Sequence, residues 1–228
     1  MNGMLTRSLE SELGEVRPSS AKTIKISSRY NIWSVVDGKY VVGVDDEGKI
    51  RRWRVKDGME TRTPMDAGSW VCDIAVSRDG KWIVSGTTGG MVQAWNVENG
   101  EKATEVNAHS DWVRAVDVSP DSTRIASGSG DRTACVWSLS TGQRLLGPWE
   151  HDDIVFAVKF SPDGRFIATT KRGFSRIYDS RDGNLVVNVP IEVSSSVSES
   201  TRPLAQRFFN GPFRATNTIA LHCQAMMH

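Results

Sequence analysis

Cysteine is scarce in this chain, and neither sign of charge is in excess. The 228 residues include three cysteines, Cys72, Cys135 and Cys223, and no CxxC pair occurs. An odd and widely spaced set does not predict a disulfide framework, and it favours a reducing compartment. We therefore expect an intracellular protein of the cytoplasm or nucleus. The net charge of +1 predicts no strong long-range attraction to nucleic acid or to an anionic membrane.

Long apolar runs are also missing. No stretch approaches the ~18 consecutive apolar residues that indicate a membrane-spanning helix. The N-terminal sequence MNGMLTRSLESELGEVRPSS contains no apolar segment of the kind found in signal peptides. The sequence therefore predicts neither a transmembrane helix nor a secretory leader.

Tryptophan, by contrast, is abundant, and it recurs with a fixed period. The chain has eight tryptophans against three tyrosines. Turn aspartates occur every 42 residues, at Asp37, Asp79, Asp121 and Asp163. An aromatic residue and then a glycine follow each turn at steps of 42, 42 and 41: Trp53, Trp95, Trp137 and Tyr178, then Gly58, Gly100, Gly142 and Gly183. Three independent markers with one period predict a repeat architecture.

Each period contains short predicted strands separated by turns. In the third unit, segments rich in Val, Ile and aromatic residues alternate with turns rich in Gly, Pro, Asp and Ser. The predicted strands are 113–118, 124–129, 133–137 and 143–147. Four antiparallel strands per unit form one blade of a β-propeller. Such a blade stacks between two neighbours, so both of its faces are apolar.

Two stretches, HSDWVRAVDVSPDSTRIASGSGDRTACVWS and HDDIVFAVKFSPDGRFIATT, resemble the WD-repeat (WD40) family. The resemblance covers about residues 25–190. It implies an all-β fold, a β-propeller of the WD40 type with about four four-stranded blades. The Trp-Asp pair typical of the family is replaced in each unit, by Trp53-Arg54, Trp95-Asn96, Trp137-Ser138 and Tyr178-Asp179.

The repeats divide the chain into three parts. Residues 1–24 are predicted to form a polar N-terminal arm, and residues 191–228 a poorly ordered tail without repeats. The repeats themselves are expected at about 25–66, 67–108, 109–150 and 151–190. Propellers generally have ~4–8 blades, and the resemblance implies about seven, so four predict an incomplete propeller. The sequence is then a fragment or truncated product, or it closes through further blades or by self-association.

One constellation in the third unit has the composition of a hydrolase triad. It comprises His109, Ser127 and Asp131, with Trp137 nearby. A triad is defined by geometry rather than by composition. The resemblance implies instead a buried structural chain in which the Trp137 indole donates to Ser127, Ser127 to His109 and His109 to Asp131. The second and fourth units hold only parts of this set: Ser85 and Trp95, and His151 and Thr169.

The candidate partner-binding residues precede or begin the first strand of each unit. Trp70, Trp112 and Ile154 are spaced at 42 residues, and Arg114 lies two positions after Trp112. The resemblance implies that this zone opens onto the narrow end face of the propeller, around the central channel. Tryptophan and arginine are typical of interface hot spots. The alternative is that both tryptophans only pack between blades, the role that we favour for Cys72 and Phe156 at the positions equivalent to Arg114.

These features predict a non-catalytic scaffold that binds a protein or peptide. One alternative is a sensor or regulatory segment of a larger signalling protein, and a less favoured one is a propeller enzyme. We expect no catalytic residue, metal or cofactor, because His222, Cys223 and His228 in the tail lack a structural-zinc spacing. We also expect no membrane or nucleic-acid partner. The basic run of Arg51, Arg52, Arg54 and Lys56 is interpreted as a solvated blade edge.

Overall fold

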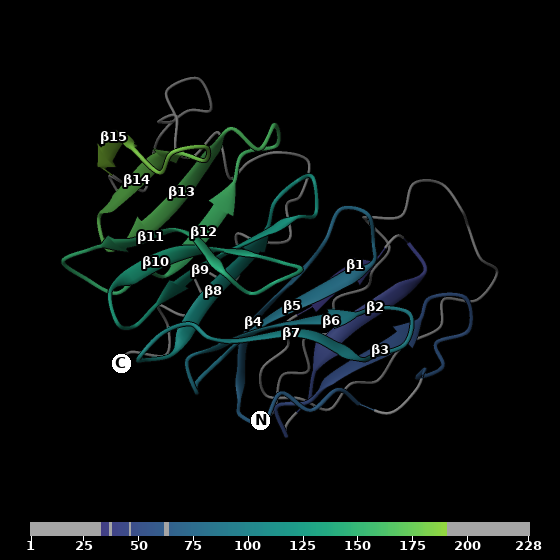
Figure 1. Cartoon of the computed structure of the whole chain (residues 1–228). Coiled ribbons are helices and arrows are strands. Elements are labelled where there is room, and N and C mark those ends of the chain that lie inside the picture. Colours follow the sequence, from purple (N-terminus) through teal and green to yellow (C-terminus); the bar gives the residue numbers. More distant parts are fainter. Residues whose placement is uncertain (1–32, 37, 46, 62–63, 191–228) are drawn as a thin grey trace, which may run out of the picture.

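The computed structural model describes residues 33–190, apart from 37, 46 and 62–63, and this part of the chain is all-β. Its strands form four antiparallel sheets arranged as an open arc (Figure 1). The predicted arm (1–24) and tail (191–228) lie outside the described residues. The all-β fold with propeller-type blades is as predicted, and the sheets do not close into a ring. Closure by further blades or by self-association stays a prediction.

Each sheet is a meander in which neighbouring strands follow one another in the chain. The first contains β1 (Trp33–Val36), β2 (Tyr40–Val44) and β3 (Ile50–Arg54). The second contains β4 (Val71–Val76), β5 (Trp82–Thr87), β6 (Met91–Asn96) and β7 (Lys102–Asn107). The third contains β8 (Val113–Val118), β9 (Arg124–Ser129), β10 (Thr133–Ser138) and β11 (Arg144–Glu150). The fourth contains β12 (Ala157–Phe160), β13 (Phe166–Lys171), β14 (Phe174–Asp179) and β15 (Leu185–Pro190).

The first sheet differs from the four-stranded expectation. Residues 59–61 and 64–65 lie beside β3, and among the described residues they form two isolated bridges with it, Ile50 with Met65 and Trp53 with Glu60. The bridged residues are three apart on β3 and five apart on the partner segment, so the two chains cannot stay in register between the bridges. Pro64 lies in this segment and has no backbone N–H to donate. The described residues of this segment therefore lie against β3 without forming a strand.

The recurring turn aspartate has a structural cause. In the second unit Ser77 Oγ donates to Asp79 Oδ1 at 2.6 Å, and the same aspartate oxygen accepts the Lys81 N–H. The third and fourth units repeat this pair, as Ser119 with Asp121 and Ser161 with Asp163. The residue after each aspartate has a positive φ, which explains the glycine that usually stands there.

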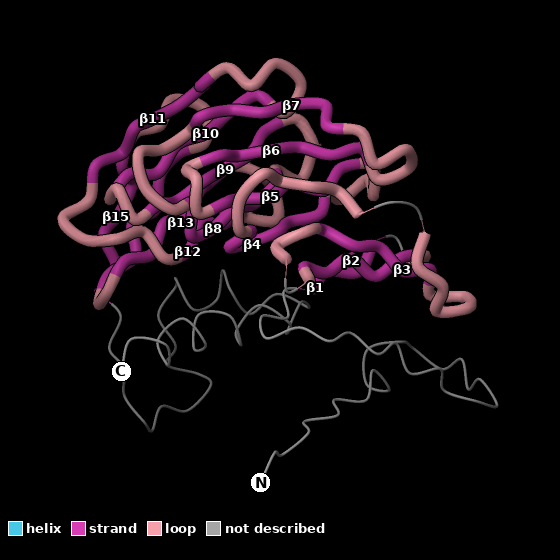
Figure 2. Tube along the Cα trace, turned by 90° about the horizontal axis from the view of Figure 1, so that it is seen from below, coloured by secondary structure: helices cyan, strands magenta, loops and turns pink. Residues whose placement is uncertain are grey.

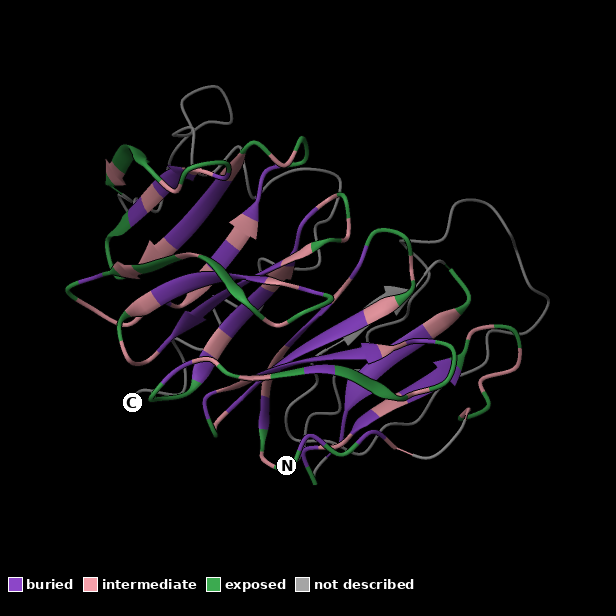
Figure 3. Cartoon of the chain, in the orientation of Figure 1, coloured by how far each residue is buried: buried purple, intermediate pink, exposed green. Residues whose placement is uncertain are grey.

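The core lies between consecutive sheets. Each of three hydrophobic clusters takes side chains from two neighbouring blades, as when Val84 and Val92 of the second sheet meet Val116 and Ile125 of the third. The innermost strands β4, β8 and β12 lie on the concave side of the arc, and β7 and β11 lie on the convex side (Figure 2). The outer strands are the exposed ones (Figure 3). Burial in this chain therefore depends on stacking of blades.

Two glycines set how closely the blades approach. A Cβ on Gly86 would lie 2.6 Å from Val113 Cγ1, and a Cβ on Gly128 would lie 2.6 Å from Val155 Cγ1. In both cases the valine precedes or begins the innermost strand of the next blade. Neither glycine has a positive φ, so it is space rather than backbone conformation that requires glycine here. The equivalent residue of the fourth blade, opposite Ala157 in the ladder, is Thr170.

We predict that Gly128→Ala destabilises the protein by about 1–3 kcal/mol, because the added methyl group overpacks the contact between the third and fourth blades. Urea unfolding measures the change. The double variant with Val155→Ala should lose less than the sum of the two single variants, since the clashing methyl group is gone. Strictly additive losses would contradict this account of the glycine.

Candidate functional site

Trp70, Trp112 and Ile154 lie at the same end of consecutive blades. Thr88 N donates to Trp70 O at 2.8 Å, Gly130 N to Trp112 O at 2.9 Å, and Phe156 N to Thr170 O at 2.8 Å. In each case the segment before an innermost strand is bonded to the second strand of the same blade or to the turn that follows that strand. We call this end the tryptophan face; it consists of residues 69–72, 87–90, 109–114, 129–132 and 152–156.

Neighbouring parts of the tryptophan face are in close contact. A Cβ on Gly90 would lie 2.1 Å from His109 O, and a Cβ on Gly89 would lie 3.0 Å from Ser69 Oγ. The hairpin turn 87–90 therefore lies between the segment that carries Trp70 and the segment that carries Trp112. The face is continuous from the second blade to the third.

The two tryptophans are exposed. Trp70 is 39% exposed and Trp112 is 45% exposed, and neither belongs to the buried clusters between the blades. Arg114 and Ile154 are partly buried. Arg114 lies in a β-bulge between Val113 and Ala115, and its guanidinium carbon is 4.6 Å from the centre of the Trp112 ring. The structure therefore brings Arg114 and Trp112 together as a stacked pair.

The loop that carries Trp112 is anchored by the four residues of the proposed structural chain. Trp137 Nε1 donates to Ser127 Oγ at 2.8 Å, and Ser127 Oγ lies 2.7 Å from His109 Nε2. His109 Nδ1 lies 3.0 Å from Asp131 Oδ2, which also accepts the Ser110 N–H. The structure thus brings all four side chains together. The series of hydrogen bonds ends at Ser110, on the loop two residues before Trp112.

The protonation state of this hydrogen-bonded series fits a structural role. Burial lowers the pKa of His109 despite the opposing charge of Asp131, so the imidazole is neutral near pH 7. A neutral ring that donates from Nδ1 to Asp131 accepts at Nε2 from the Ser127 hydroxyl. Ser127 is fully buried, so substrate cannot reach its hydroxyl. This arrangement stabilises the blade and does not form an accessible nucleophile.

In the second blade a glutamine takes the place of the histidine. Trp95 Nε1 donates to Ser85 Oγ at 3.0 Å, as in the third blade, but residue 67 is alanine. Ser85 Oγ donates instead to Gln93 Oε1 at 3.3 Å, and Gln93 Nε2 donates to Ala67 O at 3.0 Å. Sequence reasoning missed Gln93, although a fully buried amide in an apolar strand was a signal that could have identified it.

The fourth blade keeps the histidine and changes the aromatic residue. His151 Nε2 lies 2.9 Å from Thr169 Oγ1, and His151 Nδ1 lies 2.9 Å from Trp149 O. The Tyr178 ring stacks on Trp149 with centroids 4.2 Å apart. Trp149 Nε1 also donates to Gly183 O, which ties the outer strand of the third blade to the fourth.

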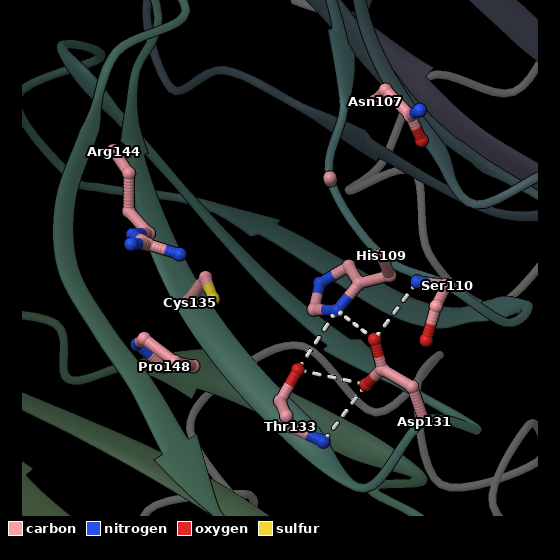
Figure 4. Close-up of a pocket in the computed structure, with 9 residues that line it drawn as sticks. Asn107, His109, Ser110, Asp131, Thr133, Cys135, Arg144 and Pro148 are labelled. Atoms are coloured by element: carbon pink, nitrogen blue, oxygen red, sulfur yellow. Dashed lines mark hydrogen bonds and ion pairs between the residues drawn. The ribbon is translucent and has the colours of Figure 1, made fainter.

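An open hollow of about 400 Å³ lies beside the His109 loop, between the second and third blades (Figure 4). It is lined by Asn107, Ala108, His109, Ser110, Asp131, Thr133, Cys135, Arg144 and Pro148. Cys135 is the counterpart of the longer Gln93 and Arg176 in the neighbouring blades, and this short side chain leaves room. Burial raises the pKa of Cys135 to about 11, so the thiol stays protonated near neutral pH and is a poor nucleophile.

Three charged side chains connect the innermost strands of consecutive blades. Asp73 Oδ2 on β4 accepts the Val116 N–H of β8 at 2.9 Å. Asp117 on β8 accepts the Phe160 N–H and the Lys159 ammonium of β12, at 2.8 and 2.7 Å. Burial raises the pKa of Asp73 to about 6, and nearby Asp117 adds to the shift. Sequence reasoning missed this group, which interrupts otherwise apolar strands.

The three arginines of the basic run in the first unit are engaged within the chain, whereas Lys56 is exposed. Arg51 pairs with Asp45 and Glu60, and Arg54 pairs with Asp57. Arg52 is buried, and its Nε donates to Thr61 Oγ1 at 2.8 Å. The arginine donors are thus committed to protein acceptors. This arrangement weighs against a phosphate-binding site at the run.

Within the described ranges, the structure contains no group of three or more His, Cys, Asp or Glu side chains that could hold a metal ion. The tail residues His222, Cys223 and His228 fall outside those ranges. The same part of the chain also has no helix long and apolar enough to span a membrane.

A family model described as WD domain, G-beta repeat matches residues 61–96, 100–138 and 144–187. Together these segments cover more than half of the chain. The second match begins before β7 and ends at the last residue of β10, so it includes the outer strand of one blade and three strands of the next. None of the curated proteins matches the chain.

We predict that Ser127→Ala lowers the free energy of unfolding by about 1–3 kcal/mol, because it leaves the Trp137 indole N–H and the His109 ring nitrogen without their buried partner. The midpoint of urea unfolding should fall while the slope stays constant. Ser140→Ala, in an exposed turn, is the matched control and should change little. Equal midpoints for the two variants would refute the structural role of the hydrogen-bonded series through Ser127.

We predict a pH-dependent difference between the wild type and Asp73→Asn. The folded-state pKa of Asp73, about 6, exceeds its ordinary value of 3.8, so only the folded state holds this proton between the two values. The wild type should therefore gain stability relative to the variant as pH falls from about 7.5 to about 4.5, by an amount of order 2 kcal/mol. Urea unfolding across this range tests it. A difference that does not vary with pH would contradict the assignment.

Proposed function

Because this chain belongs to the WD-repeat family, whose domains are generally protein-interaction scaffolds, we propose that it is a non-catalytic platform that binds a protein or peptide at the tryptophan face. The observation that carries the proposal is the exposure of Trp70 and Trp112 at the same end of adjacent blades. Large exposed apolar side chains that gather on one surface are typical of interaction sites.

The local geometry supports binding as a role of the two tryptophans, most clearly for Trp112. Neither side chain belongs to the buried clusters between the blades, and the Trp70 ring also lies against the turn at Gly48 of the first blade. Trp112 is instead stacked with Arg114, above a loop that His109 and Asp131 hold in place. A rigid aromatic anchor that is already in position loses little conformational entropy on binding.

The same geometry disfavours a hydrolytic enzyme. The hydroxyl of Ser127, the nucleophile that a triad would require, lies inside the blade with the Trp137 indole against it. The neighbouring hollow presents a Cys135 thiol whose pKa burial raises to about 11. These groups support a framework for binding and provide no activated nucleophile.

We predict that Trp70→Ala and Trp112→Ala weaken peptide binding by about tenfold or more without lowering thermal stability, as expected for hot-spot residues. The probe is a fluorescent peptide selected from a random dodecapeptide display library on the wild-type chain, and fluorescence anisotropy measures its affinity. Leu145→Ala, an equally exposed apolar residue on the outer strand β11, is the control and should bind like the wild type.

Two results would count against this proposal. If the tryptophan variants unfold at lower temperature than the wild type, packing between blades is their role. If they stay folded and bind the selected peptide as tightly as Leu145→Ala does, the binding surface lies elsewhere.

A further inference from the structure

The tryptophan face holds two polar atoms whose hydrogen-bonding capacity is unused. Among the residues that the structure describes, the buried side-chain polar atoms without a hydrogen-bond partner are Ser69 Oγ and Arg114 Nε. Ser69 directly precedes Trp70, and Arg114 is stacked on Trp112. Buried polar groups are normally satisfied, so these two atoms mark the segments around Trp70 and Trp112 as incompletely paired parts of the described structure.

Arg114 also lacks a compensating charge. No carboxylate in the described part of the chain forms an ion pair with it, whereas Arg51, Arg54 and Arg181 each pair with an acidic side chain. The guanidinium carbon of Arg114 lies 4.6 Å from the centre of the Trp112 ring, its Nε is buried, and its two terminal nitrogens carry the remaining donors as a fork. That fork matches the two oxygens of a carboxylate.

The acidic residues nearest in sequence are already committed to other donors. Asp111 Oδ1 accepts the Trp112 N–H at 2.7 Å, and Asp153 Oδ1 accepts the Ile154 N–H at 2.7 Å. Asp131 accepts from the His109 loop and from Thr133, and Asp152 pairs with Lys171. None of these carboxylates is paired with Arg114, so the terminal nitrogens of its guanidinium are left for an external acceptor, whereas the buried Nε is not.

The positive charge is specific to the third unit. The equivalent positions hold Cys72 in the second unit and Phe156 in the fourth, and Cys72 occupies the same kind of β-bulge on β4. Among these equivalent positions Arg114 is therefore the one cation, with an exposed tryptophan on each of two blades, and the other arginine of the face is the exposed Arg132 in the turn 129–132. This pattern fits a single negative charge next to apolar groups.

We propose that the tryptophan face recognises a peptide segment of a partner protein in which a single carboxylate stands next to an apolar side chain. The carboxylate accepts from the Arg114 guanidinium, and the apolar side chain covers Trp112 and Trp70. This assignment rests on the proposed function and adds the chemistry of the partner.

The charge pattern favours such a peptide over a nucleic acid. A nucleic acid is held through several phosphates at once, which requires several unpaired cations in a row. Around Arg114 the loops instead carry Asp111, Asp152 and Asp153, which would repel a phosphate backbone. A single carboxylate that meets one guanidinium avoids that repulsion.

The test repeats the dodecapeptide selection on the wild type and on Arg114→Gln, and includes Arg78→Gln as a matched control with an exposed arginine in a turn outside the tryptophan face. Peptides enriched on the wild type and on Arg78→Gln should carry Asp or Glu, and those enriched on Arg114→Gln should not. Arg114→Lys keeps the charge without the fork and should bind with intermediate affinity.

A double-variant cycle then locates the contact. The best acidic peptide and its counterpart with the carboxylate changed to an amide are compared by fluorescence anisotropy. Removing the carboxylate should weaken binding to the wild type by about tenfold or more, and should have little effect on binding to Arg114→Gln. Thermal melting of each variant confirms that the comparison is made between folded proteins.

The outcomes separate this inference from the proposed function. Enriched peptides that need Trp112 but show no acidic preference would overturn the inference and leave the proposed function standing. Failure to enrich any peptide that depends on Trp70 or Trp112 would overturn both. Binding of a fluorescent single-stranded RNA that Arg114→Gln abolishes and Arg78→Gln preserves would overturn the inference in favour of a nucleic-acid partner.

Discussion

Stacking of sheets that are apolar on both faces is the constraint on which the rest of this structure depends. Every buried cluster takes side chains from two consecutive blades, so no sheet has a core of its own. The sheets meet closely because Gly86 and Gly128 leave space for Val113 and Val155 of the next blade. A fixed distance between blades also fixes the distance between their loops. The regular end face is thus a consequence of core packing.

The sequence repeat and the structural blade are out of step, and this offset couples the blades. The matched segment 100–138 supplies β7 to the second sheet and β8, β9 and β10 to the third. One repeat therefore cannot fold without the two sheets that it joins, as in other linear arrays whose stability comes from neighbouring interfaces. Side-chain links reinforce the coupling, including Asp117 of β8 with Lys159 of β12.

Features with a periodic cause could be predicted from the sequence. The Ser-Asp turn bond recurs in three blades, so Asp79, Asp121 and Asp163 carry a readable spacing. Features that depend on how far a single side chain reaches could not be predicted from the sequence. Gln93 on β6 takes the place of a histidine that the third blade holds in the loop before its first strand, and no alignment of equivalent positions reveals that exchange. The stacking of Arg114 on Trp112 depends on a β-bulge, which is a local irregularity of pairing.

The division between periodic and variable residues explains where a binding surface can arise in this fold. Residues that recur, such as the hydroxyl-bearing Ser85, Ser127 and Thr169, are hydrogen-bonded to other side chains of their own blades. They therefore cannot vary independently of those partners. The bulge position at the tryptophan face is free of that requirement, and it holds Cys72 or Arg114 above similar frameworks. In the third blade the framework extends to the loop itself, because Asp131 holds the Ser110 N–H. A rigid hydrogen-bonded framework holds the loops in place, and the side chain at the bulge position can vary without disturbing it. Under these two conditions a scaffold can acquire specificity without losing its fold.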